Sequence, residues 1–163
     1  MYIAPSPELG ANNVNLPSTS IAQLGSTPLM TATAAGATLT YNTGTAGWAG
    51  GGFTYDNFAT GPFESADLSG IKDLVVGLKG TASQVKLEIV ANENGAEKKA
   101  SVYLTGISST TEKFWSIPMV LFASQGVNIR NAKQFYFIVE GSNKSGALEI
   151  HVNKSAGASI HTE

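Results

Sequence analysis

Runs of alternating hydrophobic and polar residues fill the middle of the chain, from residue 67 to residue 118. The clearest run is Val85-Lys86-Leu87-Glu88-Ile89, in which apolar and charged residues alternate strictly. Because successive side chains of a strand point to opposite faces, this run predicts a β-strand with one buried face. Similar runs lie at residues 74–78, 102–104, 115–117, 135–139 and 148–152, and residues 38–41 form a further β-prone stretch.

Turn residues separate neighbouring runs. Asn92-Glu93-Asn94-Gly95 offers residues that tolerate positive φ, as a tight connection between antiparallel strands requires. Short strands with one buried face each need a second sheet to pack against. The pattern therefore predicts an all-β fold, a two-sheet antiparallel β-sandwich.

The two ends of the chain differ from its middle in composition. Four of the six prolines lie in residues 1–28, which we interpret as a linker or irregular N-terminal arm. Within this arm Ile21 and Leu24 form a short apolar patch that is able to dock on the sandwich as an edge strand. The sandwich is predicted to span residues 29–153, and residues 154–163 to form a C-terminal tail or linker.

Residues 44–58 combine glycines with the aromatic residues Trp48, Phe53, Tyr55 and Phe58. Glycine lets the backbone approach other groups closely, and aromatic rings offer large faces for contact. We expect Trp48 and Tyr55 to be exposed and to contact a ligand, whereas Phe53 and Phe58 fit the core or a ligand equally well. A phosphate-binding loop is excluded because no Lys-Ser/Thr pair and no helix follow the glycines.

Composition and charge exclude several classes of function. The net charge is -2 and the basic residues are scattered singly, which argues against a nucleic-acid surface. No apolar run approaches the roughly 18 residues of a membrane span. Because the chain has no cysteine, disulfides, thiolate metal sites and a cysteine nucleophile are also excluded.

The first residues, Met1-Tyr2-Ile3-Ala4-Pro5-Ser6-Pro7, have no basic region and no continuous hydrophobic core, so no signal peptide is predicted there. A cytosolic protein and a mature or excised piece of a larger protein both fit this start. We favour the excised piece, and therefore expect the protein outside the cell or on its surface.

Residues for enzyme chemistry are sparse. The chain has two histidines and no Gly-x-Ser-x-Gly motif, so a nucleophilic hydrolase is not predicted. Glu88, Glu140 and Glu149 are conceivable carboxylates for glycoside hydrolysis, although single Glu residues at outward strand positions are usually only solvated. The sequence predicts a protein that is not an enzyme.

Two groups of short motifs occur in a characteristic order. The first is DLSG at 67–70 with a strand that ends in LKG at 78–80. The second is VKLE at 85–88, VYL at 102–104, WSIP at 115–118, GVNIRNAK at 126–133 and LEIHV at 148–152. In this order the chain, over residues 36–153, resembles the galactose-binding-like jelly-roll domains. Among these it is most similar to bacterial carbohydrate-binding modules of the family 11 type.

The resemblance implies a sandwich of about eight to ten strands that binds glycan, in a concave cleft or at the loops of one end, without catalysis. Aligned on Ile117-Pro118, it places Trp115 in the core and turns Phe114 outward. Modules of this kind often hold a structural calcium ion through an aspartate in the last strand, where this chain has His151 and Asn153. No cofactor is expected, and a structural calcium ion stays open because backbone carbonyls with Asp56, Glu64 or Asp67 would supply oxygen ligands.

We therefore predict a non-catalytic carbohydrate-binding module, covalently linked to a catalytic domain, that binds a polysaccharide or oligosaccharide. Exposed rings stack on sugars, and polar groups bind hydroxyls. An outward set of polar and aromatic strand residues, Lys86, Glu88, Tyr103, Tyr136, Glu140, Glu149 and His151, is what a sugar-binding sheet face requires. The predicted site residues are Trp48 and Tyr55 for stacking, Tyr103 and Tyr136 for stacking or hydrogen bonding, and Lys86, Glu88 and Glu140 for hydroxyl binding.

Two alternatives stay open. In the first, the chain is a structural or adhesive subunit whose N-terminal arm adds a strand to a neighbour's sheet. In the second, it is an intracellular scaffold domain of the same fold.

Overall fold

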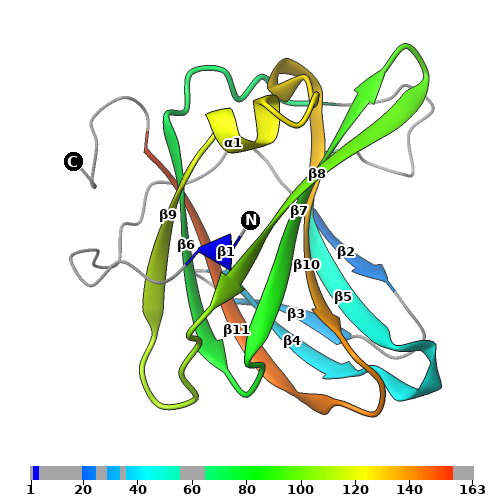
Figure 1. The fold of residues 1–163 in the computed structure, drawn as a ribbon, viewed down its shortest axis with the longest axis vertical. Coiled ribbons are helices and arrows are strands. Elements are labelled where there is room, and N and C mark those ends of the chain that lie inside the picture. Colours follow the sequence, from blue (N-terminus) through cyan, green and yellow to red (C-terminus); the bar gives the residue numbers. More distant parts are fainter. Residues whose placement is uncertain (1, 4–19, 25–28, 34–35, 56–64, 156–163) are drawn as a thin grey trace.

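The computed structural model describes residues 2–3, 20–24, 29–33, 36–55 and 65–155, which form a sandwich of two β-sheets (Figure 1). The six-stranded sheet has the order β1 (Tyr2–Ile3), β8 (Ala96–Thr105), β7 (Gln84–Glu93), β10 (Ala132–Glu140), β5 (Trp48–Thr54) and β2 (Ser20–Leu24). The five-stranded sheet has the order β3 (Leu29–Thr33), β4 (Gly36–Asn42), β11 (Ser145–Ser155), β6 (Asp73–Gly80) and β9 (Lys113–Pro118). Neighbouring strands are antiparallel except for β1 and β8, so the predicted sandwich is confirmed.

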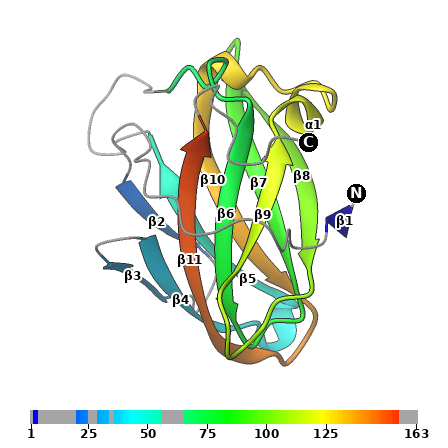
Figure 2. The same ribbon diagram turned by 90° about the vertical axis from the view of Figure 1, so that its left-hand side faces the viewer.

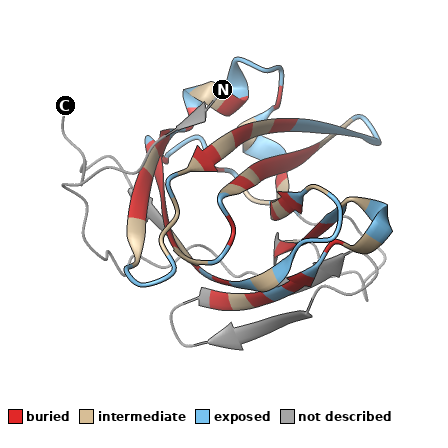
Figure 3. Cartoon of the chain, turned by 60° about the horizontal axis from the view of Figure 1, so that its bottom comes forward, coloured by how far each residue is buried: buried red, intermediate tan, exposed pale blue. Residues whose placement is uncertain are grey.

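The core lies between the two sheets and follows the predicted alternation. Val85, Leu87 and Ile89 on β7 are fully buried, and buried and more exposed residues alternate along parts of β8 and β10 (Figure 3). Trp115 is also fully buried, which confirms its expected place in the core. Phe114 faces the opposite side of the sheet, as expected, but it is buried there against Val75.

Short helices and turns connect the strands. Asn94 and Gly95 have φ angles of 51° and 82°, which make the tight turn between β7 and β8 that their sequence predicts. The helical segments are η1 (Gly44–Ala46), α1 (Val120–Ala123) and η2 (Ile129–Asn131). Within the described part of the chain, no helix is long and apolar enough to cross a membrane.

The N-terminal residues contribute strands to both sheets. Strand β2 pairs with β5, β3 pairs with β4, and both lie at the same side of the sandwich (Figure 2). Residues 1–28 are therefore not only a linker, because β1 and β2 belong to the six-stranded sheet. The patch of Ile21 and Leu24 lies in the edge strand β2, as its sequence suggested. At the other end, β11 continues to Ser155, beyond the expected boundary at residue 153.

Candidate ligand-binding groove

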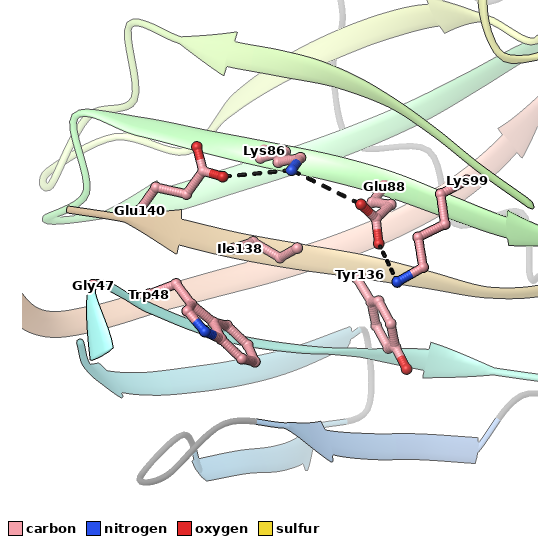
Figure 4. Close-up of a pocket in the computed structure, with 8 residues that line it drawn as sticks. All are labelled: Gly47, Trp48, Lys86, Glu88, Lys99, Tyr136, Ile138 and Glu140. Atoms are coloured by element: carbon pink, nitrogen blue, oxygen red, sulfur yellow. Dashed lines mark hydrogen bonds and ion pairs between the residues drawn. The ribbon is translucent and has the colours of Figure 1, made fainter. Parts of the chain in front are cut away.

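A groove of about 520 Å³ lies on the outer face of the six-stranded sheet, over strands β5, β7 and β10 (Figure 4). A volume of this size is within the range of small-ligand sites. The groove is lined by Gly47, Trp48, Lys86, Glu88, Lys99, Tyr136, Ile138 and Glu140.

Strand register brings these residues together. Lys86 and Glu88 alternate with the buried Leu87, so they face outward from β7. On β10 next to it, Ile138 pairs with Lys86 and Tyr136 pairs with Glu88. The alternation that builds the core therefore also places a polar and aromatic row on the opposite face.

Two glycines of β5 lie beside β10 on the sheet face that carries the groove. Gly52 pairs with Tyr136, and Gly50 pairs with Ile138. A Cβ atom at Gly52 would lie 2.7 Å from Tyr136 Cδ1, and one at Gly50 would lie 3.1 Å from Ile138 Cγ1. The side chains of Tyr136 and Ile138 thus occupy space that is open only because β5 has glycine at these two positions.

A row of alternating charges forms one side of the groove, in the order Glu140, Lys86, Glu88 and Lys99 (Figure 4). Lys86 Nζ lies 3.4 Å from Glu140 Oε1 and 3.9 Å from Glu88 Oε2. The other Glu88 oxygen lies 3.8 Å from Lys99 Nζ. The charges of two carboxylates and two ammonium groups cancel, so the row is close to neutral overall. Glu88 is only 8% exposed, and the two lysines compensate the charge of its buried carboxylate.

Aromatic side chains form the other side. Trp48 is 40% exposed, and it is one of two exposed large hydrophobic residues in the described part of the chain. Tyr136 is half-buried, and burial, with a smaller contribution from the charge of Glu97, raises the pKa of its phenol. Tyr136 therefore stays protonated at neutral pH and offers both a ring face and a hydroxyl group.

The structure brings together five of the seven predicted site residues in the groove: Trp48, Lys86, Glu88, Tyr136 and Glu140. Tyr103 lies just outside it, on β8 opposite Lys86, and its hydroxyl donates a hydrogen bond to Glu140 Oε2 at 3.2 Å.

Tyr55 is the exception, and its predicted exposure is wrong. It packs against the core and forms an edge contact with Phe135, with ring centroids 6.3 Å apart. Burial raises the pKa of its phenol strongly. The side chain of Phe53 and all of Phe58 lie outside the part of the chain that the structure describes.

Two expected members of the outward set lie elsewhere. Glu149 and His151 are on β11, in the other sheet, where they contact Lys79 and Glu112. Conversely, sequence reasoning missed Lys99, which the β7–β8 pairing sets opposite Val90. Only the register of the β7–β8 hairpin could have identified Lys99 as a groove residue, because no hydrophobic alternation surrounds it in the sequence.

Of the three acidic residues named as calcium ligands, only Asp67 lies in the described part of the chain. Asp56 and Glu64 lie outside that part, and Asp67 Oδ1 accepts a hydrogen bond from the Ser69 backbone N–H at 2.9 Å. Among the described residues, no group of three acidic, histidine or cysteine side chains is arranged to hold a metal ion.

Known structures share this architecture, although no protein-family model and no curated protein matches the sequence. A family 30 carbohydrate-binding module of a cellulosomal cellulase of Clostridium thermocellum is 14% identical. The match covers 85% of this chain and 87% of that module, with a TM-score of 0.59. A family 11 module of another cellulosomal cellulase of the same organism is 16% identical over 94% of this chain and 93% of the module, with a TM-score of 0.57.

A family 11 module from Clostridium thermocellum in complex with a β-1,3-1,4-mixed-linked tetrasaccharide is 15% identical. It matches over 89% of each chain, with a TM-score of 0.54. The chain therefore has the β-sandwich fold of the family 11 and family 30 carbohydrate-binding modules, as the order of its sequence motifs implied.

Proposed function

We propose that this chain is a non-catalytic carbohydrate-binding module whose groove binds a neutral polysaccharide or oligosaccharide. The observation that carries the proposal is the exposed ring of Trp48 at the groove, on the same sheet face as Tyr136 and a neutralised row of charges. Pyranose rings present C–H faces that stack on aromatic rings, and hydroxyl groups that bind charged and amide side chains.

The dimensions of the groove favour an oligosaccharide over a single sugar. Trp48 and Gly52, the partner of Tyr136, are four residues apart on β5, which corresponds to ~13 Å at ~3.3 Å per residue. At the backbone this span is longer than one pyranose ring, which favours a ligand of more than one sugar unit.

A hydrolytic function is less well supported by the same groove. Glu88 and Glu140 both face Lys86, whose ammonium group lies within 4 Å of each carboxylate. In a two-carboxylate glycoside hydrolase, the glycosidic bond has to lie between the two acids. Lys86 occupies that space here, and Glu149 is on the other sheet.

The proposed role is to hold a covalently attached enzyme or surface protein on its polysaccharide by raising its local concentration. Such a role places the protein outside the cell or on its surface. The related modules of known structure support this, because two of them come from cellulosomal cellulases.

Affinity electrophoresis in gels that contain soluble β-glucan, xylan or mannan tests the proposal. We expect at least one glycan to retard the chain, and Trp48→Ala to abolish most of that retardation. Val120→Ala is the matched control, because Val120 is also an exposed apolar residue but lies on α1. Retardation of Trp48→Ala equal to that of the wild type, or no retardation by any glycan, would contradict the proposal. The same gels with a chelator test for the calcium ion.

Assembly through the N-terminal arm is the alternative. The strands described in that arm pair within the chain, β1 with β8 and β2 with β5. Light scattering on the intact protein tests this alternative, which requires an oligomer.

A further inference from the structure

A second pocket, of about 340 Å³, lies at the end of the sandwich where the β6–β7 and β10–β11 turns meet, at the bottom of Figure 1. Val139 of β10 and Gln84 of β7 line this pocket, whereas Glu140 and Lys86 of the same two strands line the groove. The two sites are therefore separate but lie on the same two strands.

The floor of this pocket is fixed by close packing. Tyr41 is buried, and its hydroxyl shares a hydrogen bond of 3.0 Å with Thr81 Oγ1. The contact depends on Gly146, because a Cβ atom there would lie 2.8 Å from the Tyr41 hydroxyl oxygen. These polar groups are thus positioned before any ligand arrives.

The rim is held by the turn between β4 and β5. The Thr43 backbone N–H donates to the Lys144 carbonyl at 2.8 Å, and the Lys144 N–H donates to Thr43 Oγ1 at 2.8 Å. Asn143 adopts a left-handed conformation with φ of 56°, and its N–H donates to the Gly44 carbonyl at 2.9 Å. The backbone that carries Lys144 is therefore anchored on both sides.

The chemistry of the lining differs from that of the groove. None of the residues that line this pocket is acidic, and Lys144 is the single charged one. Lys144 makes no ion pair with the described residues, whereas the two lysines of the groove face glutamates. Hydroxyl and amide groups complete the lining, from Thr81, Ser83, Gln84, Asn143 and Ser145.

We infer that this pocket is a second sugar-binding site, and that it binds a pyranose with one negative charge, as a carboxylate or a sulfate. The ammonium group of Lys144 binds the anionic group, and the neighbouring hydroxyl and amide groups bind the sugar hydroxyls. A neutral sugar leaves Lys144 without a counter-charge and therefore binds more weakly.

Backbone amide NMR titrations of the whole chain test this inference, with glucuronate, glucose 6-sulfate and glucose as probes. We expect saturable shifts at residues 81–84 and 143–145 with at least one anionic sugar, and an affinity for glucose at least about fivefold lower. Comparing the affinities for glucuronate and glucose 6-sulfate shows whether the pocket prefers a carboxylate or a sulfate.

Two variants assign the effect to the pocket. Lys144→Gln is expected to weaken binding of the anionic sugar at least about fivefold. Lys79→Gln is the control, because it removes an exposed lysine of the five-stranded sheet and should leave binding unchanged. No saturable shift at these residues, equal affinity for glucose, or equal affinity of Lys144→Gln and the wild type would overturn the inference.

The groove is tested separately from this pocket. Trp48→Ala should bind the anionic sugar as well as the wild type does, even though it loses retention on neutral glycans. Loss of both activities in Trp48→Ala would show that the anionic sugar binds in the groove, and would overturn the second site.

Discussion

The Tyr103 hydroxyl donates a hydrogen bond to Glu140 Oε2 at 3.2 Å, from β8 across β7 to the end of β10. The other oxygen of the same carboxylate accepts a hydrogen bond from Lys86 Nζ at 3.4 Å. Glu140 is therefore oriented from two other strands. Through this contact Tyr103 positions a carboxylate of the groove although it does not itself line the groove.

Tyr103→Phe should lower the glycan affinity of the groove about threefold, because a single exposed hydrogen bond is worth ~0.5–1.5 kcal/mol. The melting temperature should fall by only about 2–4 °C, because the same hydrogen bond also contributes to the folded state. Isothermal titration calorimetry with the best glycan measures the effect. Tyr103→Ala separates two roles, since a much larger loss in that variant would mean that the ring itself contacts the sugar. Wild-type affinity in Tyr103→Phe would refute the positioning role.

Tyr55→Phe should keep glycan binding and leave the free energy of unfolding unchanged or raise it by up to about 1 kcal/mol. The Tyr55 hydroxyl is buried and has no hydrogen-bond partner among the described residues. Removing a buried, unpaired hydroxyl while keeping the ring relieves a desolvation cost. Urea denaturation measures the change, and a clear loss of stability would show that the hydroxyl does have a partner.

Gly52→Ala should destabilise the protein by about 1–3 kcal/mol and reduce glycan binding, because a Cβ atom would collide with β10 and displace the Tyr136 ring. Gly70→Ala is a matched control, since Gly70 has an ordinary φ and no atom within 4 Å of the added Cβ. Thermal melts and affinity gels of the two variants give the comparison. Equal stability of both variants would show that β5 and β10 accommodate the side chain.

Glu93→Gln should reduce stability at pH 7, and this loss should shrink as the pH falls below 4.5. Hydrogen bonds from Lys98 and from the Asn128 backbone N–H hold the pKa of Glu93 below its ordinary value of 4.5. A carboxylate with a lowered pKa stabilises the fold above its ordinary pKa, and this contribution disappears as the pH falls through the folded-state value. Urea denaturation at several pH values measures the difference between wild type and variant. A difference that is constant with pH would mean that the Glu93 charge is not involved.

The fold could be predicted from the sequence because strands and turns are encoded by residues that are close together in the chain. In β7 the alternation around Leu87 indicated that Val85, Leu87 and Ile89 face the core, and Asn94-Gly95 indicated where the hairpin turns. Alternation identifies the outward face of a strand but not the sheet to which the strand belongs. For this reason Glu149 and His151, although they alternate correctly, lie on the wrong sheet for the groove.

The error at Tyr55 has a different cause. Trp48 and Tyr55 are seven residues apart, and an odd separation in a continuous strand places two side chains on opposite faces. Strand β5 runs without a break from Trp48 to Thr54, directly before Tyr55. Strand parity alone would have assigned Trp48 to the groove and Tyr55 to the core.

Strand β2 pairs with β5 along residues 50–54, on the side of β5 that faces away from β10. A protease cut before residue 29 that released this strand would leave β5 with an unpaired edge, and exposed edges of this kind join to other chains. Trimming of the N-terminal segment would then favour self-association of the cleaved chains at the strand that carries Trp48, with every residue of the groove still present.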